Sequence, residues 1–261
     1  MTKTAGQAES GAWVDRDASV DASCVIGQGA RLFGRVQVDQ RVRIESNALL
    51  YGPARIGPGC FIGPNVILGF PARNELMDSI SAGRNIYEVP SKRQLIVGRD
   101  CVVRSGTCIY SDVTIGDFVS FGHNAIVREN VRIGKHTMVG TGVVIDGSCQ
   151  IGERVSIQTG AYIPTNCKIE DSVFLGPHAV LTNDKYVTQK KTKLQGPTIR
   201  RGASIGANSL LMPCIEVGEG SIVGAHSLVT RNIPPRSIYV GVPAKKMKKV
   251  PANWRTSLLQ A

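Results

Sequence analysis

The sequence predicts an all-β fold in which the chain winds into a parallel β-helix, and three observations support this. Aliphatic residues recur at every sixth position over most of the 261 residues. Glycine, present 29 times, often follows the aliphatic residue. Aromatic residues make up only 5% of the chain, so smaller side chains must fill the core. A period of six fits neither an isolated α-helix nor an ordinary alternating strand.

Three runs of aliphatic positions carry this prediction. Val14 to Leu68 holds ten repeats, Val97 to Leu181 holds fifteen, and Ile199 to Val229 holds six. Each repeat supplies a short strand, whose aliphatic side chain points to the axis, and a corner where glycine tolerates a positive φ. Because three repeats close one coil, and parallel strands lie about 4.8 Å apart, the runs predict about ten coils.

Two breaks in the repeat predict extruded loops, at about residues 70–95 and 183–198. The separation of 29 between Leu68 and Val97 is not a multiple of six, so the intervening segment must leave the coil. The separation of 18 between Leu181 and Ile199 equals one full coil, so we expect the second loop to bulge while the register is kept. Long loops of this kind are usually functional or disordered.

The remaining chain is expected to form one β-helix domain over residues 12–250 and a helical tail over 251–261. In that tail Trp254 and Leu258 would pack, and the segment would cover the bare strand edges at the end of the coil.

The net charge, the apolar runs and the cysteines indicate which kinds of ligand and cell compartment fit the sequence. The net charge of +11 fits a soluble basic surface or an electrostatic funnel for an anionic ligand. No nucleic-acid motif accompanies the charge, no run of 18 apolar residues predicts a membrane span, and Met1 to Ser10 lacks the apolar core of a signal peptide. Seven cysteines without a Cys-x-x-Cys pair argue against zinc and favour a reducing cytoplasm.

The four histidines fall into two registers. His136, His178 and His226 each lie three residues after an axial aliphatic residue, whereas His123 lies two residues after Phe121. The different register suggests a different role, and imidazole is the side chain best suited to accept a proton near neutral pH. The alternative is a corner histidine bonded to a neighbouring carbonyl group.

Over residues 12 to about 249 the repeat resembles the hexapeptide-repeat (left-handed β-helix) acyltransferase superfamily, nearest to the nucleotide-sugar amino-group N-acetyltransferases. The end of the coil, Val240-Gly241-Val242-Pro243-Ala244-Lys245, resembles that superfamily's Gly-x-Pro-Ala-[Lys/Arg] signature. The resemblance implies left-handed coils, against the usual crossover rule. It also implies a homotrimer with active sites between subunits, and acetyl-CoA or another acyl-CoA as co-substrate without a metal.

The resemblance also implies site residues. The segment Gly-His-Asn resembles one in which the histidine is the general base, which gives His123, Asn124 and Glu129 as catalytic candidates, with Glu129 orienting the ring. Thr182-Asn183-Asp184 resembles a segment of the substrate and cofactor cleft. The substrate-binding candidates are therefore Asn183, Asp184 and Tyr186, joined by Arg73 and Tyr87 from the first loop.

For coenzyme A, two pairs of small residues 18 positions apart would stack on one corner and let the pantetheine arm approach backbone amides. They are Gly206-Ala207 and Gly224-Ala225. Four basic residues could bind the phosphates: Arg200, Arg201, Lys245 and Lys246. The 84 residues from Phe121 to Ile205 equal 14 repeats, or four and two-thirds coils. This count places His123 and Ala207 on different edges of the coil, which favours a site shared between subunits.

The sequence therefore predicts an acyl-CoA-dependent N-acyltransferase acting on the amino group of a nucleotide-linked amino sugar. Another small amine or hydroxyl acceptor, such as an antibiotic or an amino acid, is the first alternative. A non-catalytic scaffold is a second. A γ-type carbonic anhydrase is a third, although it needs three histidines on zinc, and His123 and His136 are 13 residues apart with no third histidine near them.

Overall fold

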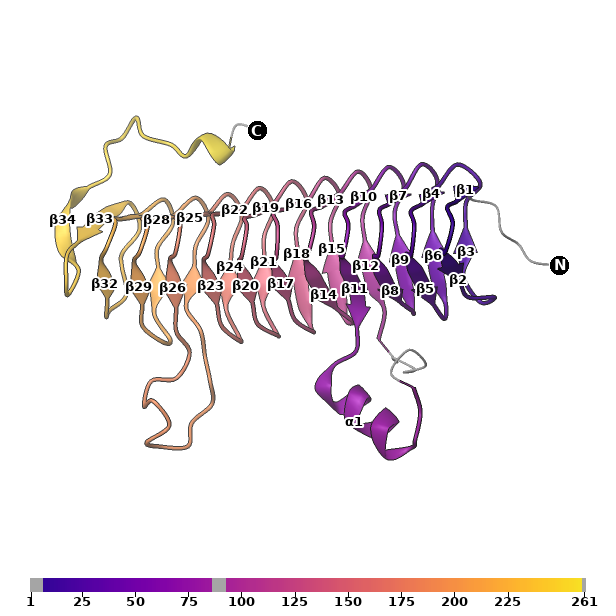
Figure 1. The fold of residues 1–261 in the computed structure, drawn as a ribbon. Coiled ribbons are helices and arrows are strands. Elements are labelled where there is room, and N and C mark those ends of the chain that lie inside the picture. The colour runs from indigo at the N-terminus through magenta and orange to yellow at the C-terminus, as the bar shows by residue number, and fades with distance from the viewer. Residues whose placement is uncertain (1–6, 86–92, 260–261) are drawn as a thin grey trace. The chain divides into compact units, whose positions relative to one another are not determined.

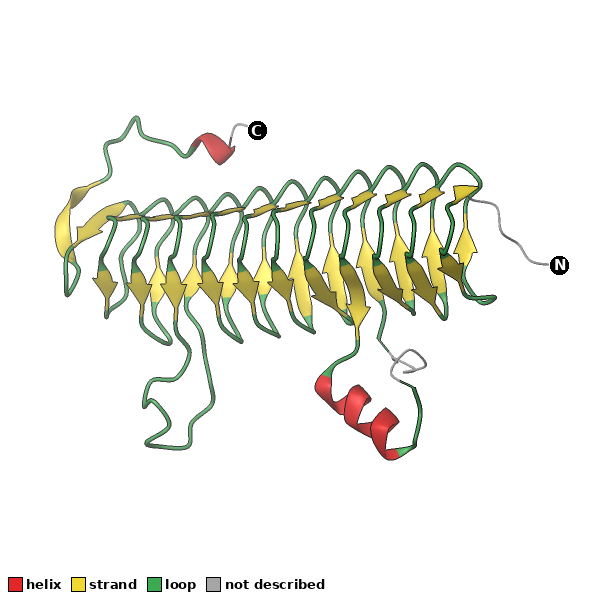
Figure 2. Ribbon diagram, in the orientation of Figure 1, coloured by secondary structure: helices red, strands yellow, loops and turns green. Residues whose placement is uncertain are grey.

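The computed structural model describes residues 7–85 and 93–259, and in these residues strands predominate over a single α-helix (Figure 2). The chain forms two compact units, Met1–Asn130 and Val131–Ala261. Each unit is a left-handed parallel β-helix with three sheets, and each is described separately below. In each unit the chain passes from sheet 1 to sheet 2 to sheet 3 and back, through corners 1–2, 2–3 and 3–1 (Figure 1).

Unit 1 is built from strands of two to four residues that pair in parallel with the strand one coil further on. Sheet 1 contains β1 (Gln7–Ala8), β4 (Val25–Ile26), β7 (Arg43–Ile44), β10 (Phe61–Ile62), β13 (Val102–Val103) and β16 (Ser120–Phe121). Sheet 2 contains β2 (Trp13–Val14), β5 (Arg31–Phe33), β8 (Leu49–Tyr51), β11 (Ile67–Phe70), β14 (Cys108–Tyr110) and β17 (Ile126–Val127). Sheet 3 contains β3 (Ser19–Val20), β6 (Val36–Val38), β9 (Ala54–Ile56), β12 (Leu95–Val97) and β15 (Val113–Ile115).

Unit 2 repeats this plan. Its sheet 3 contains β18 (Val131–Ile133), β21 (Gln150–Ile151), β24 (Lys168–Ile169), β27 (Thr198–Ile199) and β30 (Glu216–Val217). Its sheet 1 contains β19 (Met138–Val139), β22 (Ser156–Ile157), β25 (Phe174–Leu175), β28 (Ser204–Ile205), β31 (Ile222–Val223), β33 (Ser237–Val240) and β34 (Lys245–Lys249). Its sheet 2 contains β20 (Val144–Ile145), β23 (Tyr162–Ile163), β26 (Val180–Leu181), β29 (Leu210–Leu211) and β32 (Leu228–Val229).

The repeated aliphatic side chains form the core, as the sequence predicts. In unit 1, Ile44, Ile56 and Leu68 are completely buried, one from each sheet, and Ile145 and Ile205 are equally buried in unit 2. The predicted number of coils, about ten, is too low because the count misses a strand at each end of the repeat. It missed β1, which precedes the first counted repeat, and β33, which follows the last.

Both breaks in the repeat occur at corner 2–3 of their unit. Residues 71–94, between β11 and β12, form loop 1, which contains the helix α1 (Arg73–Ser81) that the sequence did not predict. Residues 182–197, between β26 and β27, form loop 2, which contains no helix or strand (Figure 1).

The expected register of the second break is wrong. β27 pairs with β24, with Ile169 opposite Ile199, so the chain advances by one sheet across loop 2 and not by a full coil. The loop therefore lengthens a single six-residue step. Counted this way, Phe121 and Ile205 are separated by whole coils, without the extra two-thirds of a coil. The spacing therefore no longer favours a site shared between subunits.

The C-terminal part of unit 2 ends the coil with an antiparallel hairpin. β34 pairs with β33, Val240 lying opposite Lys245, and so covers the outer edge of sheet 1. The expected tail helix is a 3₁₀ turn, η2 (Ser257–Leu259), and Trp254 is 50% exposed rather than packed. None of the described helices is long and apolar enough to cross a membrane.

Candidate functional site

His123 lies at corner 1–2 of unit 1, between β16 and β17, and its side chain is exposed. Its Nδ1 lies 2.7 Å from the hydroxyl Oγ of Ser105, which occupies the same corner one coil earlier. The contact fixes the ring plane and engages one ring nitrogen. Sequence reasoning missed Ser105, although a step of 18 residues back from His123 would have found it.

The register difference among the histidines is confirmed in the backbone. His136, His178 and His226 hold the left-handed corner position, with φ of 59°, 55° and 57°. At the His123 corner this position belongs to Asn124, with φ of 54°. His123 is therefore the one histidine that is not needed to make a corner.

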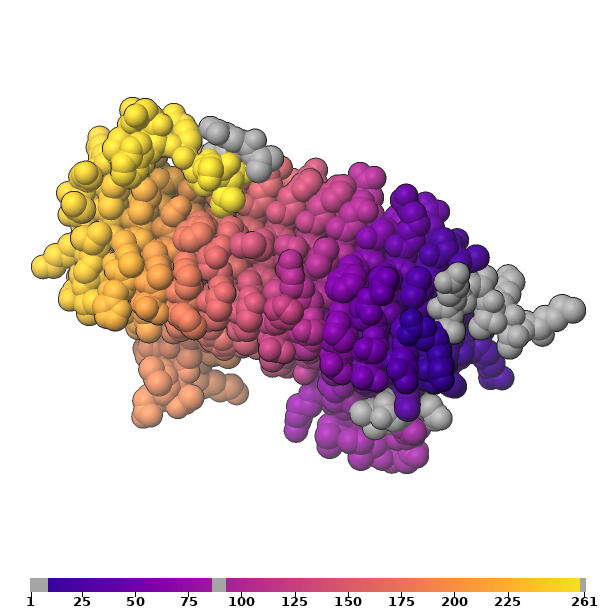
Figure 3. Space-filling model, turned by 45° about the horizontal axis from the view of Figure 1, so that its top comes forward, coloured from indigo at the N-terminus to yellow at the C-terminus, as the bar shows by residue number. Residues whose placement is uncertain are grey.

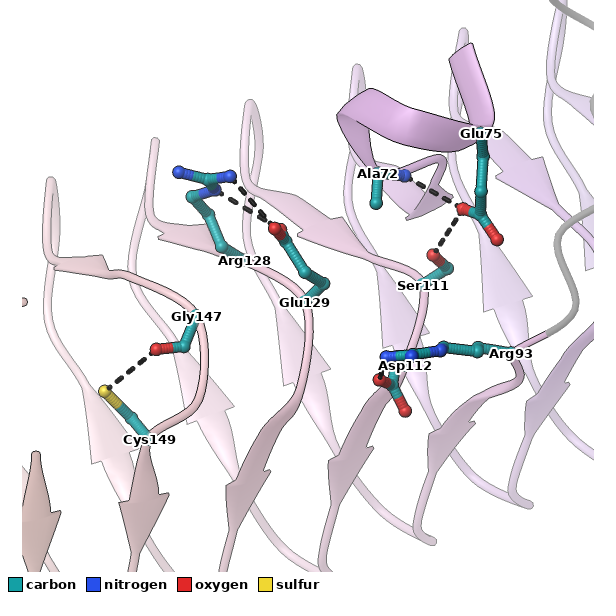
Figure 4. Close-up of polar contacts among 9 residues, drawn as sticks. All are labelled: Ala72, Glu75, Arg93, Ser111, Asp112, Arg128, Glu129, Gly147 and Cys149. Carbon is teal, nitrogen blue, oxygen red and sulfur yellow. Dashed lines mark hydrogen bonds and ion pairs between the residues drawn. The ribbon is translucent and has the colours of Figure 1, made fainter. Parts of the chain in front are cut away.

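The other two catalytic candidates, Asn124 and Glu129, make contacts within unit 1. Asn124 donates its backbone N–H to Ser105 O at 3.0 Å, and its side chain fills the space over Gly106. The Glu129 carboxylate accepts from Arg128 at 3.0 and 3.3 Å (Figure 4). The printed contact of the His123 ring is with Ser105, and the role of Glu129 in orienting the ring stays a prediction.

Loop 1 is tied to the coil of unit 1 near both of its ends. The Glu75 carboxylate accepts from the backbone N–H of Ala72 at 3.0 Å and from the hydroxyl of Ser111 at 3.2 Å. At the other end, Arg93 forms an ion pair with Asp112 at 2.5 Å (Figure 4). These contacts attach loop 1 to the coil on both sides of the helix α1.

Of the two substrate-binding candidates in loop 1, only one can be placed. Arg73, the first residue of α1, is exposed, and no hydrogen bond or ion pair joins it to another residue within the described parts of the chain. Tyr87 lies outside the described residues.

The small residues proposed for coenzyme A lie at corner 1–2 of unit 2, on adjacent coils. A Cβ on Gly206 would lie 2.4 Å from the backbone N of Ala225, so the coil itself requires glycine there. Ala207 is half-buried and Ala225 is exposed, which leaves a surface of small side chains and backbone at this corner. Close approach of a slender chain such as pantetheine is compatible with this surface.

The hairpin of β33 and β34 borders the same corner. A Cβ on Gly224 would lie 2.7 Å from the Cγ1 of Val240, which pairs with Lys245 across the hairpin. Lys245 and Lys246 are both exposed on β34. The hairpin therefore places these two lysines on the strand beyond Val240, and their contact with coenzyme A phosphates stays a prediction.

Arg200 and Arg201 do not join that group, because they lie at corner 3–1. Arg200 donates to Glu170 at 2.9 Å and to Glu216 at 2.6 Å, and these hydrogen bonds raise the pKa of Arg200 and lower that of Glu216. Burial alone would raise the pKa of Glu170, but the bonds from Arg200 and the Arg201 amide outweigh it and lower the pKa. An arginine shared by two carboxylates is already neutralised, which disfavours the predicted phosphate contact of Arg200.

The polar residues at the start of loop 2 shape the loop. The Asp184 carboxylate accepts from the backbone N–H of Tyr186 at 2.9 Å and of Thr188 at 2.7 Å, and these bonds lower its pKa. Asn183 donates its side-chain amide to Thr165 O at 3.3 Å. Both side chains therefore have partners within unit 2, and their contacts with a substrate stay a prediction.

Tyr186 is the aromatic residue of loop 2, and it lies in an exposed stretch, residues 185–194. Its side chain is 39% exposed, and the ammonium groups of Lys185 and Lys190 lie 5.8 and 5.4 Å from the ring centroid. An aromatic ring flanked by two cations suits an anionic or polar ligand. Across residues 7–85 and 93–259, no cluster of three or more His, Cys, Asp or Glu side chains could hold a metal ion.

Part of the chain matches models of known protein families. The family model described as bacterial transferase hexapeptide (six repeats) matches residues 112–147, 148–183 and 196–231. A second model, the hexapeptide repeat of succinyl-transferase, matches residues 130–165.

Two relatives match part of the chain. A serine acetyltransferase of Buchnera aphidicola is 38% identical over 87 residues, which cover 30% of this chain and 33% of the relative. A chloramphenicol acetyltransferase of Klebsiella aerogenes is 44% identical over 55 residues, covering 21% and 26%. The chain thus spans about a third or less of the length of these relatives.

Among solved structures, PerB of Caulobacter crescentus, determined with CoA and GDP-perosamine, is 19% identical. The match covers 73% of this chain and 70% of the PerB chain, with a TM-score of 0.38. The repeated aliphatic positions and the three-sided parallel coils agree with the matched repeats, so residues 112–183 and 196–231 carry the hexapeptide repeat of bacterial transferases.

Proposed function

We propose that this protein is an acyl-CoA-dependent N-acyltransferase, which transfers an acetyl group to the amino group of a nucleotide-linked amino sugar. The observation that carries the proposal is the exposed His123 held by Ser105 at 2.7 Å, in a register that no corner requires. A base whose ring is fixed by a second side chain is the arrangement expected for proton transfer during acyl transfer.

In the proposed reaction the acceptor amine attacks the thioester carbonyl carbon, and His123 takes the amine proton on Nε2. For Nε2 to accept a proton, Nδ1 must carry the ring hydrogen and donate it to Ser105 Oγ. The tetrahedral intermediate then collapses, the carbon–sulfur bond breaks, and the leaving thiolate of coenzyme A takes the proton from His123, which returns to its neutral form. The products are the N-acylated acceptor and free coenzyme A.

Acyl-CoA is assigned to corner 1–2 of unit 2. The small side chains of Ala207 and Ala225 support this, because a pantetheine arm needs close approach to backbone amides. Lys245 and Lys246 supply positive charge for the phosphates. Arg200 is left out of this role, since two carboxylates already share it.

The acceptor class rests on the resemblance of residues 182–184 and on the exposed ring of Tyr186 between two lysines. Arg73, exposed at the start of α1, is a further contact for an anionic acceptor. The seven cysteines are free thiols, which fits a reducing cytoplasm, where acyl-CoA is available.

The proposed assembly is a homotrimer, as the family resemblance implies. The outward side chains of sheet 2 in unit 2 are all apolar: Val144, Tyr162, Val180, Leu210 and Leu228. Such a face favours contact with another subunit. Light scattering should give three times the chain mass of 27.9 kDa, and Leu210→Glu should lower it.

The test of function is a turnover screen with acetyl-CoA against a panel of nucleotide-linked amino sugars, an aminoglycoside, chloramphenicol and serine, with the product mass measured. We expect a mass gain of one acetyl group on an amino sugar. Turnover only with an antibiotic or an amino acid would replace the acceptor class, and no turnover with any acceptor would contradict acyl transfer.

A further inference from the structure

A cavity of about 530 Å³ lies in unit 2 between corner 3–1 and the C-terminal segment. One wall comes from the coil, including Ile222, and the other from the segment after β34, including Val250 and Trp254. Figure 3 shows the C-terminal segment, in yellow, lying against the coils of this unit. The volume is in the range of pockets that hold small organic ligands.

The segment is fixed to the coil by named contacts. Arg236, at corner 3–1, donates to the carbonyl oxygens of Pro251 at 2.7 Å and Trp254 at 3.3 Å. Further along, Ser172 donates its hydroxyl to Leu258 O at 3.3 Å. The cavity therefore lies between two parts of the chain that are held together by these hydrogen bonds.

The lining carries an excess of positive charge. Arg201, Arg236 and Arg255 line the cavity together with one carboxylate, Glu219. Arg201 is paired with Asp171 at 3.4 Å, so the excess of positive charge comes from Arg236 and Arg255. Arg255 donates only to the carbonyl oxygens of Ala252 and Trp254, at 2.6 and 2.8 Å, and Arg236 also donates to carbonyl oxygens. Because carbonyl groups are neutral, these hydrogen bonds orient the two guanidinium groups without offsetting their charge.

This cavity is separate from the site assigned to acyl transfer. Within unit 2 it lies at corner 3–1, whereas Ala207, Ala225 and the bordering lysines lie at corner 1–2 and loop 2 leaves at corner 2–3. Arg236, Val250, Trp254 and Arg255 also lie beyond residue 231, the last residue matched by the family models.

We propose that this cavity is a second binding site, which takes a nucleotide. The heteroaromatic base packs against the indole of Trp254 and the side chain of Ile222, and the phosphate accepts hydrogen bonds from Arg236 and Arg255. Planar guanidinium groups suit phosphate oxygens, and an aromatic ring beside cations suits a base that carries a charged group. Because its two walls belong to the coil and the C-terminal segment, a bound nucleotide fastens that segment to unit 2.

The chain offers a direct probe, because it contains only two tryptophans, Trp13 and Trp254. In a Trp13→Phe protein the indole fluorescence reports on the cavity alone. Titration with adenosine monophosphate, and in parallel with uridine monophosphate, should give a saturable change for at least one. Adenosine, uridine and inorganic phosphate should each bind at least about tenfold more weakly, since each fills only part of the site.

Charge variants complete the test. Arg255→Gln should weaken nucleotide binding about tenfold or more, because its bonds lie within the C-terminal segment and their loss leaves the Arg236 anchor in place. Glu219→Gln should tighten binding a few-fold by removing a repulsive charge. The matched control Arg231→Gln removes the same charge in unit 2 outside the cavity lining and should change nothing.

Several outcomes would overturn the proposal. These are no saturable signal up to millimolar nucleotide, equal effects of Arg255→Gln and Arg231→Gln, or weaker binding in Glu219→Gln. Acyl transfer at saturating substrates should be unchanged in Arg255→Gln, so the result for this site and the result for the proposed reaction are read out separately.

Discussion

Loop 1 and loop 2 leave the coil at the same kind of corner, yet they are held by different chemistry. Loop 1 contains a helix and is anchored by ionisable side chains, with Glu75 bound to Ser111 and Arg93 paired with Asp112. Loop 2 has no regular element. Its base is closed by neutral amides, Asn166 donating to Leu194 O and Gln195 donating to Asn166 O, both at 2.8 Å.

The packing beneath the two loops differs in the same way. Phe70, immediately before loop 1, contacts Tyr51 and Tyr110 with ring centroids 5.9 and 5.3 Å away. Loop 2 instead displays its only aromatic ring, Tyr186, at the surface. The difference teaches that loop 1 is oriented by packing and charge, whereas loop 2 is pinned only at its base and presents its outer residues to a ligand.

Shortening loop 2 is expected to have the largest effect. The loop is shortened so that Ile199 follows Leu181 by six positions, as in an ordinary repeat. The coil should remain, since β27 already pairs with β24. Acyl transfer should fall by about 100-fold or more, the size expected when substrate positioning is lost. Circular dichroism should show an unchanged fold, and retained turnover would contradict the role of loop 2.

Glu75→Ala should produce the next largest effect, on loop 1. It removes the acceptor of two hydrogen bonds that fix α1 to the coil, at a cost of about 2 kcal/mol, since each bond involves a carboxylate. Trypsin should then cleave faster at Arg84, just after α1, while cleavage in loop 2 is unchanged. Equal acceleration in both loops would indicate general destabilisation instead.

Asn166→Gly should loosen loop 2 by a smaller amount. Asn166 has φ of 65°, which glycine tolerates, so the substitution removes mainly the bond to Leu194 O, worth about 1 kcal/mol. Trypsin cleavage at Lys190 and Lys191 should accelerate. The matched control Asn208→Gly, at another left-handed corner with φ of 55°, should leave that cleavage rate unchanged.

The smallest effect concerns the pH dependence of loop 2. Since hydrogen bonds from Tyr186 and Thr188 lower the pKa of Asp184, the ionised carboxylate holds the turn above the ordinary pKa of an aspartate and releases it only as the pH falls through the lowered value. The amide proton shift of Thr188, followed by NMR, should therefore stay constant from pH 7 to 5 and change at more acidic pH. A transition near neutral pH would contradict this account.

Much of the fold could be predicted from the sequence because a single period fixes both the strand and its burial. The distinct register of His123 was equally visible in the spacing. The Ser105 contact needed only the 18-residue step. In contrast, the neutralisation of Arg200 depends on Glu170 and Glu216, and loop 2 alters the spacing between them.

The helix α1 illustrates a different limit. Its side chains are mostly exposed, including Met77 at 46% and Ile80 at 63%, so no buried apolar stripe marks it in the sequence. Asp184 likewise has the residue type of a ligand contact, but its oxygens bind the backbone of its own loop. Residue type cannot distinguish these roles, since both require a carboxylate.

The most direct test of the central claim is the rate of coenzyme A release from acetyl-CoA in the presence of an amino-sugar acceptor, compared between His123→Asn and His136→Asn. Asparagine already holds the left-handed corner position at Asn124 and Asn208, so His136→Asn should fold, and His123→Asn should fold because no corner requires His123. We predict that His123→Asn lowers kcat by about 100-fold or more, as expected for loss of a general base, and that His136→Asn does not. Equal rates in the two variants would contradict the assignment of His123 as the base.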